Sequence, residues 1–314
     1  MKLLEEKINT AVSLRNILVA TDFSAVSETA LPYATAISRR YGSMVHLAHV
    51  VPMSKFPVPP GAVDPTTIGS IYEETHTEAQ EMMQHLAGRL RGFPHQTYVR
   101  HGKMCDVLSE IIREQEVDLL VVGTHGRTGV GKLVMGSVAE EILRQVSCPV
   151  LTVGPKVHKS PQLCGFEGDR EVLPSEIEFR RILYATDFAP HSLAAASYAF
   201  SLAREFRARL TLLHVIEEYG EHLHDRPGPI EAPLRKLEEL TSEEGALRYS
   251  PEPVVEFGSP ADSILQTASE READLIVLGV RAADGQLGAA THLPLATGHR
   301  VITRANCPVL TIRS

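Results

Sequence analysis

Residues 15–50 read RNILVATDFSAVSETALPYATAISRRYGSMVHLAHV, and residues 180–215 read RRILYATDFAPHSLAAASYAFSLAREFRARLTLLHV. Both segments begin with an apolar run that ends in ATDF and continue with a stretch of helical periodicity. Both close in a second apolar run that ends in His-Val. Internal repeats of this length reveal the organisation of a chain before any single motif does.

Two further blocks recur in the same order. Residues 101–123 (HGKMCDVLSEIIREQEVDLLVVG) return as residues 257–279 (FGSPADSILQTASEREADLIVLG), and SCPVLTV at 147–153 returns as NCPVLTI at 306–312. Three blocks in one order indicate duplication of a whole domain. Between the copies lies a stretch rich in Pro, Gly and charge without a clear period, which is typical of a linker. We therefore expect a domain over 1–154, a linker over 155–179 and a second domain over 180–314.

Strand and helix patterns alternate within each copy. In the first copy a helical pattern from Leu31 to Tyr41, stopped by Gly42, separates two apolar, β-branched runs. The expected strands are Asn16–Ala20, Met44–Val51, Asp118–Gly123 and Val150–Val153, with a short helix over Val138–Val146. This alternation predicts an α/β fold, with a parallel sheet and right-handed crossovers.

Composition narrows the classes of function. The 314 residues carry a formal charge of −8, which disfavours nucleic acid and anionic membrane surfaces as partners. The beginning of the chain does not read as a secretory signal, and no apolar run is long enough to span a bilayer. The four cysteines lack CxxC spacing. We expect a cytoplasmic protein.

A glycine-rich loop in the first copy has the pattern of a phosphate-binding site. Gly123 ends a predicted strand, Gly126 follows, and Gly136-Ser137 opens a predicted helix. Glycines let the backbone approach an anion closely, and a helix N-terminus presents free N–H groups at its positive end. Residues 126–132 (GRTGVGK) also match the first seven positions of a P-loop motif. However, Leu133 stands at the next position, where that motif needs Ser or Thr to bind magnesium.

The first copy resembles an ATP-binding universal stress protein domain, whose signature is G-x2-G-x9-G-[ST]. ILVATDFS at the first strand and the His-Val at residues 49–50 match as well, and the similarity covers both copies. The resemblance implies two tandem Rossmann-like, doubly wound α/β domains, each with a five-stranded parallel sheet. It also implies ATP as ligand, with or without magnesium, while ADP and AMP remain alternatives. The binding residues that it implies are Ala20, Thr21, Asp22, Val50, Gly123, Gly126, Arg127, Gly136, Ser137 and Val138.

Several of these residues have plainer interpretations. Ser137 and Glu140 form a capping box, which would satisfy the helix without a ligand. Asp22 could be a turn or cap residue, and Arg127 a solvated side chain. The cysteines that precede proline, Cys148 and Cys307, read as small buried apolar groups. The pair His222 and His224 is too isolated to indicate a metal site, and no residue is assigned to catalysis.

The second copy departs from the pattern after Gly279. Ala282 stands at the second glycine, and alignment back from Cys307 places Leu295-Ala296 where Gly136-Ser137 stand in the first copy. A leucine side chain where the backbone should meet phosphate predicts weak or no ATP binding by this copy.

Three classes of function follow. The first is a cytoplasmic ATP-binding regulatory protein of the stress response, in which the second copy pairs with the first. The resemblance implies that last strands pair, which the two CPVLT strands could do within one chain or in a homodimer. The second is a slow ATPase or phosphotransferase using the same pocket, and the third is an ATP-independent scaffold.

Overall fold

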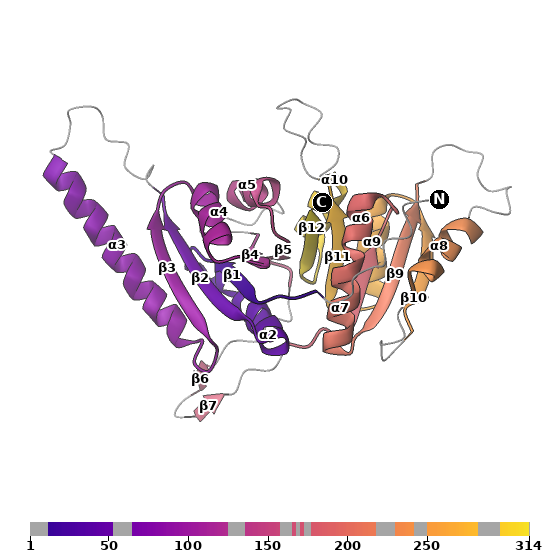
Figure 1. The fold of residues 1–314 in the computed structure, drawn as a ribbon, viewed down its shortest axis with the longest axis horizontal. Coiled ribbons are helices and arrows are strands. Elements are labelled where there is room, and N and C mark those ends of the chain that lie inside the picture. Colours follow the sequence, from indigo (N-terminus) through magenta and orange to yellow (C-terminus); the bar gives the residue numbers. More distant parts are fainter. Residues whose placement is uncertain are drawn as a thin grey trace. The chain divides into compact units, whose positions relative to one another are not determined.

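The computed structural model describes residues 12–52, 65–124, 136–157, 165–167, 170–172, 177–217, 230–241, 250–281 and 296–313. It divides into two compact units. The N-terminal unit comprises Leu14–Cys148 and Ser160–Ile177, and the C-terminal unit comprises Met1–Ser13, Pro149–Lys159 and Glu178–Ser314. Each unit is an α/β structure (Figure 1).

In the main sheet of the N-terminal unit the strands run parallel in the order β3-β2-β1-β4. The chain moves outward from β1 to β3 and then returns to the other side of β1. Right-handed crossovers therefore place α2 and α3 on one face of the sheet and α4 and α5 on the other. The elements are β1 (Asn16–Ala20), α1 (Ala25–Glu28), α2 (Leu31–Tyr41), β2 (Met44–Val51), α3 (Pro65–Gly88), β3 (His95–His101), α4 (Met104–Glu114), β4 (Leu119–Gly123) and α5 (Ser137–Gln145).

The C-terminal unit repeats this order with parallel strands β10-β9-β8-β11-β12. Its elements are β8 (Arg181–Ala185), α6 (Pro190–Ala194), α7 (Ala196–Phe206), β9 (Arg209–Ile216), α8 (Glu231–Thr241), β10 (Glu252–Phe257), α9 (Pro260–Glu270), β11 (Leu275–Val280), α10 (Ala296–Arg304) and β12 (Val309–Arg313). The expectation of tandem doubly wound α/β domains is confirmed.

The strand β5 (Val150–Val153) belongs to the C-terminal unit, although it comes from the first sequence repeat. It pairs with β12 in antiparallel register, with Leu151 opposite Leu310. Thr152 Oγ1 donates to the Val309 carbonyl at 3.0 Å, and Thr311 Oγ1 donates to the Val150 carbonyl at 3.2 Å. The strand pair is thus reinforced by side chains of both strands.

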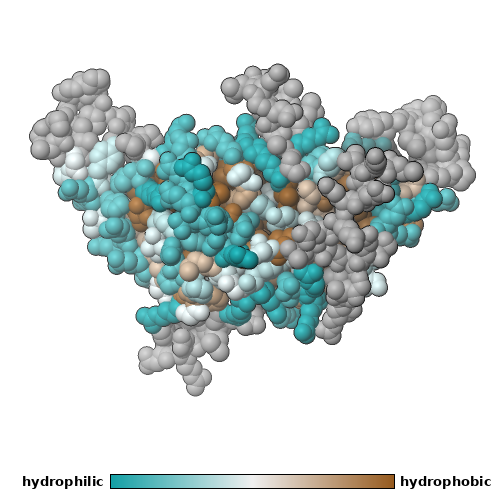
Figure 2. Space-filling view, viewed as in Figure 1, coloured by the Kyte–Doolittle hydropathy of each residue, from teal (hydrophilic) through white to brown (hydrophobic). Residues whose placement is uncertain are grey.

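Both cores are mainly aliphatic and follow the strand runs, and the C-terminal core also contains the buried aromatic residues Phe179, Tyr184 and Phe200. The central strands are buried along their whole apolar stretch, as in Ile17–Val19 and Leu119–Val122, which is typical of parallel sheets covered on both faces. Gly42 ends α2 in the left-handed region at φ 70°, and its N–H donates to the Ser38 carbonyl, as the sequence predicted. Figure 2 shows mostly hydrophilic side chains over the described part of the visible face.

Three sequence expectations differ from the structure. The linker contains a short antiparallel hairpin of β6 (Gly165–Glu167) and β7 (Arg170–Val172). Residues 65–88 form α3 and residues 95–101 form β3, although the sequence predicted no helix or strand there. The N-cap of α5 is Gly136, so Ser137 is the first helical residue and not the N-cap residue that the expected capping box requires. Glu140 instead forms an ion pair with Arg144.

No helix in the described part of the chain combines the length and apolarity needed to cross a membrane.

Candidate functional site

The turn after β1 is built by its own side chains. Thr21 N donates to the Ala48 carbonyl at 2.9 Å, and Phe23 N donates to Thr21 Oγ1 at 2.9 Å. Phe23 takes φ 59°, which is uncommon for a residue with a side chain. Thr21 is 4% exposed, and its hydroxyl also lies 3.1 Å from Ser27 Oγ. The buried Thr21 side chain therefore stabilises the turn through its hydrogen bonds.

Asp22 is a turn residue, which is one of the two roles that the sequence left open for it. Its Oδ1 accepts from Ser24 N at 3.0 Å, which is an Asx turn. Ser24 in turn caps α1, since its hydroxyl accepts from Ser27 N at 3.1 Å. The carboxylate therefore lies at the carboxyl end of β1, held by the first residues that follow the strand.

His49 fixes the same turn from β2. Its Nδ1 lies 2.8 Å from the Thr21 carbonyl, and since a carbonyl only accepts, Nδ1 carries the proton. The ring also packs against Phe23, with centroids 4.3 Å apart. The neighbouring Val50 is buried at 2% exposure, so its side chain is part of the core.

The second repeat builds the same turn with the same atoms. Phe188 N donates to Thr186 Oγ1 at 3.0 Å, and His214 Nδ1 lies 2.8 Å from the Thr186 carbonyl. Phe188 takes φ 63°, and the centroids of the Phe188 and His214 rings lie 4.5 Å apart. ATDF and His-Val are therefore a structural pair in both repeats, whatever either repeat binds.

Gly123 and Gly136 lie beside this turn. The parallel register of β1 and β4 pairs Ala20 with Val122, so Thr21 and Gly123 leave the sheet next to each other. Gly136 N donates to the Thr124 carbonyl at 3.0 Å, which ties the start of α5 to the end of β4. The carboxyl edge at β1 and β4, where the strand order reverses, is the usual ligand position in open α/β sheets.

The structure thus gathers part of the predicted site. Ala20, Thr21, Asp22, Gly123 and Gly136 lie at this edge, and the backbone of Ser137 and Val138 forms the first turn of α5. Gly126 and Arg127 lie outside the described residues, as does the P-loop-like segment. So do His222 and His224.

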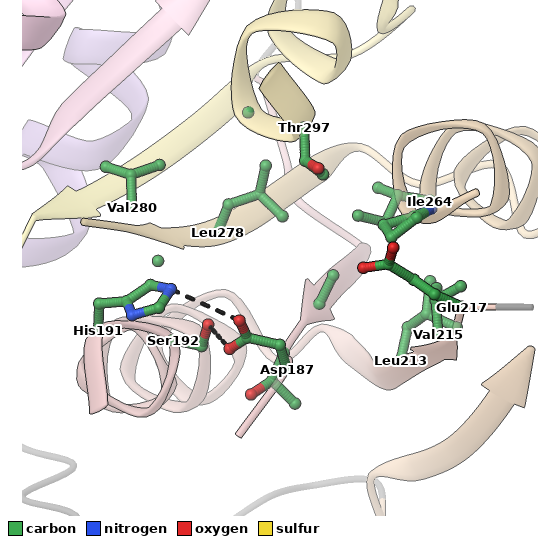
Figure 3. A pocket seen from close by; sticks show the side chains of 15 residues that line it. Asp187, His191, Ser192, Leu213, Val215, Glu217, Ile264, Leu278, Val280 and Thr297 are labelled. Carbon is green, nitrogen blue, oxygen red and sulfur yellow. Dashed lines mark hydrogen bonds and ion pairs between the residues drawn. The ribbon is translucent and has the colours of Figure 1, made fainter. Parts of the chain in front are cut away.

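A cavity of about 170 Å³, which no sequence pattern indicated, lies in the second repeat at the carboxyl ends of β8, β9 and β11. Figure 3 shows Asp187, His191 and Ser192 on one side of it and Glu217 on another. His191 Nε2 lies 3.6 Å from Asp187 Oδ2, and Ser192 Oγ donates to Asp187 Oδ1. His191 and Ser192 stand where the first repeat has Val26 and Ser27, and comparison of the two ATDF segments could have found them.

The described cysteines form no disulfide and are buried, and burial is what the sequence suggested for Cys148 and Cys307. Burial raises the pKa of Cys105 to about 11 and that of Cys148 to about 12. Burial therefore favours the protonated thiol over the nucleophilic thiolate at both positions near neutral pH.

Comparison with known proteins gives one consistent result. The model of the Universal stress protein family matches residues 13–154 and 178–313. A universal stress protein of Mycolicibacterium smegmatis is 27% identical over 310 residues, covering 95% of this chain and 96% of that protein. One of Thermus aquaticus is 37% identical over 141 residues, covering 43% of this chain and 99% of the relative.

Among solved structures, the crystal structure of a universal stress protein from Archaeoglobus fulgidus covers 98% of both chains with a TM-score of 0.66. Its sequence identity to this chain is 22%, so it supports the fold alone.

Proposed function

The chain belongs to the universal stress protein family, with one family domain in each repeat, and on that premise we propose that it is a nucleotide-binding regulatory protein of the stress response. ATP binds in the first repeat, at the carboxyl edge of β1 and β4. The second repeat holds no nucleotide and serves as a pairing module. We place the protein in the cytoplasm and divide it into domains 1–154 and 180–314 with a linker over 155–179.

The observation that carries this proposal is the position of the α5 N-terminus. Gly136 stands directly before the helix in an extended conformation, and no side chain of its own caps the first turn. The N–H groups of a helix's first turn have no intrahelical acceptors, and the helix dipole makes that end positive. Ser137 and Val138 contribute such N–H groups beside the end of β4. A phosphate chain would satisfy them.

The remaining residues have defined parts in this arrangement. The side chains of Thr21 and Val50 are buried, so their contact with a nucleotide is made through the backbone. Asp22 contributes a carboxylate at the adenosine side, and Gly126 and Arg127 complete the loop around ribose and phosphates. Occupancy can regulate the protein only if two of its conformations bind the nucleotide with different affinity.

The sequence of the second repeat lacks the glycine–serine pair at the corresponding position. Leu295 is the counterpart of Gly136, and α10 begins at Ala296 with no serine at its first position. The pairing role rests on the hydrogen-bonded strands β5 and β12, which would join the two repeats within one chain. In a homodimer, the same strands would pair between two chains.

Calorimetric titration of the intact chain with ATP tests the proposal. We expect one nucleotide per chain, loss of binding in Gly136→Leu and retention in Gly136→Ala, because among the described residues a Cβ at Gly136 would approach only the Thr124 carbonyl oxygen, at 3.5 Å. Leu295→Ala is the matched control in the second repeat and leaves the titration unchanged. Two sites of equal affinity, or unchanged binding by Gly136→Leu, would contradict the assignment.

A second measurement separates regulation from catalysis. Nucleotide that copurifies with the chain is identified by mass spectrometry, and turnover of added ATP is followed. Bound ATP without turnover supports a regulatory protein, whereas ADP with steady turnover indicates an ATPase. A pocket that stays empty at millimolar ATP indicates a scaffold.

A further inference from the structure

In each repeat, the helix that follows the fourth strand packs against the helix that precedes that strand. In the first repeat α5 contacts α4 (Figure 1), and in the second repeat α10 contacts α9. The two helix pairs are counterparts, because residues 101–123 recur as 257–279 and residues 147–153 recur as 306–312. The side chains that join the two helices differ between the repeats.

In the second repeat one carboxylate joins α9 to α10. Asp262 Oδ2 accepts from Arg300 Nη2 at 2.8 Å, and Asp262 Oδ1 accepts from Arg304 Nη1 at 2.7 Å. Arg300 Nη1 also donates to Ser259 Oγ, at 3.4 Å. The bonds from Arg304 and Arg300 lower the pKa of the Asp262 carboxyl, so it stays ionised near neutral pH. A network of this kind holds better than an isolated surface ion pair.

The first repeat has different residues at the same positions. The counterpart of Asp262 is Asp106, but the counterparts of Arg300 and Arg304 are Glu141 and Gln145. Among the described residues no ion pair links α4 to α5. The polar side chains of α5 bond within the helix instead: Arg144 pairs with Glu140, and Gln145 Nε2 donates to Glu141 Oε1 at 3.2 Å.

Like charges face each other across the contact between α4 and α5. Burial is the main cause of the raised pKa of Cys105, and the nearby carboxylates of Glu141 and Asp106 raise it further. Because Cys105 lies in the first turn of α4, Glu141 approaches it from the other helix. Two carboxylates near one thiol repel each other, and such pairs destabilise a contact about as much as opposite charges stabilise it.

We propose that α5 is the loosely held helix of the first repeat and reports nucleotide occupancy by becoming ordered, whereas α10 is its locked counterpart. This rests on the proposed function, since the phosphate chain would meet the first turn of α5. Without nucleotide, repulsion between Asp106 and Glu141 leaves α5 attached mainly by its buried apolar residues, which are Ala139, Ile142 and Leu143. Hydrogen bonds to phosphate add a second attachment and make local opening of the helix rarer.

Hydrogen exchange of the intact chain, followed by mass spectrometry with and without ATP, tests the proposal. Without ATP we expect the amides of α5 to exchange faster than those of α10, after correction for intrinsic amide rates. Glu141→Arg combined with Gln145→Arg copies the two arginines of the second repeat. This double variant should slow α5 exchange by about two- to fivefold, the effect of a small surface ion-pair network. ATP should slow α5 exchange in the wild type and less in the double variant.

Two control variants isolate the ion pairs. Adding Asp106→Asn to the double variant keeps the new arginines but removes their partner, so α5 exchange should return to the wild-type rate. Conversely, Arg300→Glu combined with Arg304→Gln should speed α10 exchange and leave α5 unchanged. Equal exchange of α5 and α10 without ATP, or a double variant that exchanges as fast as the wild type, would overturn the proposal.

Calorimetry with ATP separates this proposal from the proposed function. If ATP binds and α5 exchange does not change, α5 does not report occupancy, although the nucleotide site stands. If ATP does not bind, the nucleotide site is wrong, and the reporting role of α5 is wrong with it.

Discussion

Gly123 packs so closely on α1 that a Cβ added to it would lie 3.1 Å from the Cα of Ser27. The same Cβ would lie 3.1 Å from the Val26 carbonyl oxygen. The glycine that ends β4 therefore lets the helix after the ATDF turn approach the strand. In the second repeat Gly279 meets α6 even more closely, since its Cβ would lie 2.1 Å from the His191 carbonyl oxygen. This contact explains why the repeat without a phosphate loop still has a glycine here.

Alanine at these glycines is expected to destabilise both units. Backbone atoms cannot yield as a flexible side chain can, so Gly279→Ala should cost about 3 kcal/mol or more and Gly123→Ala about 1–2 kcal/mol, as overpacked cores do. Denaturant unfolding of the nucleotide-free chain measures both. Gly136→Ala is the control and should change stability little, since its Cβ would lie 3.5 Å from the Thr124 carbonyl oxygen, which is ordinary van der Waals contact. Equal stability of all three variants would mean that neither α1 nor α6 packs closely enough for a Cβ on the facing glycine to clash with it.

Asp22 can be separated into a turn role and a ligand role. Asp22→Ala removes the acceptor for Ser24 N and should lower the free energy of unfolding by about 1 kcal/mol. Asp22→Asn retains an oxygen acceptor and should stay close to wild type in stability. If the carboxylate contacts nucleotide as proposed, both variants weaken ATP binding, as calorimetry will show. A stable Asp22→Asn with wild-type affinity would assign Asp22 to the turn alone.

Two histidines of the N-terminal unit predict a loss of stability on acidification. His46 is 2% exposed and lies 3.2 Å from both Tyr98 Oη and Asn16 Oδ1. Burial lowers the pKa of His46 below its ordinary value of 6.5, and burial together with His76 lowers that of His101. A depressed pKa in the folded chain contributes stability above 6.5 that is lost as the pH falls, since the unfolded chain takes up protons more readily.

Unfolding at about pH 7.5 and about pH 5.5 measures this contribution, which spans the range where an ordinary histidine titrates. Each unit of pKa depression corresponds to about 1.4 kcal/mol. His46→Gln should reduce the difference in unfolding free energy between the two pH values. The exposed His85 supplies the control, and His85→Gln should leave the difference unchanged. A pH dependence that survives His46→Gln in full would assign it to other groups.

The sequence predicts most of the fold because its signals are local. Apolar runs and Gly42 place β1, α2 and β2 at their observed bounds. β3 was missed because its residues, HQTYVRH, are mixed in polarity at the edge of the sheet. The close contacts of Gly123 and the His49–Thr21 hydrogen bond join residues from different elements, which no periodicity reveals. The cavity of the second repeat was missed for the same reason, since its carboxylates come from separate strand ends.

The threonines of the β5–β12 pair offer a direct test of what joins these strands. Thr152 and Thr311 are 1% and 3% exposed, and each donates its hydroxyl to a carbonyl of the opposite strand. Valine has nearly the same shape without the donor, so Thr152→Val and Thr311→Val should each lower the free energy of unfolding by about 0.5–1.5 kcal/mol.

The double variant should lose less than the sum of the two single variants, since neighbouring residues in one network couple. Thr303→Val is the control, because the Thr303 hydroxyl donates to the His299 and Arg300 carbonyls within α10. Such a bond within one helix contributes little to joining strands. The four chains are compared by denaturant unfolding, with size-exclusion chromatography to detect self-association. If Thr152→Val and Thr311→Val match Thr303→Val in stability, backbone pairing alone holds β5 on β12, and the two hydroxyls only fill space between them.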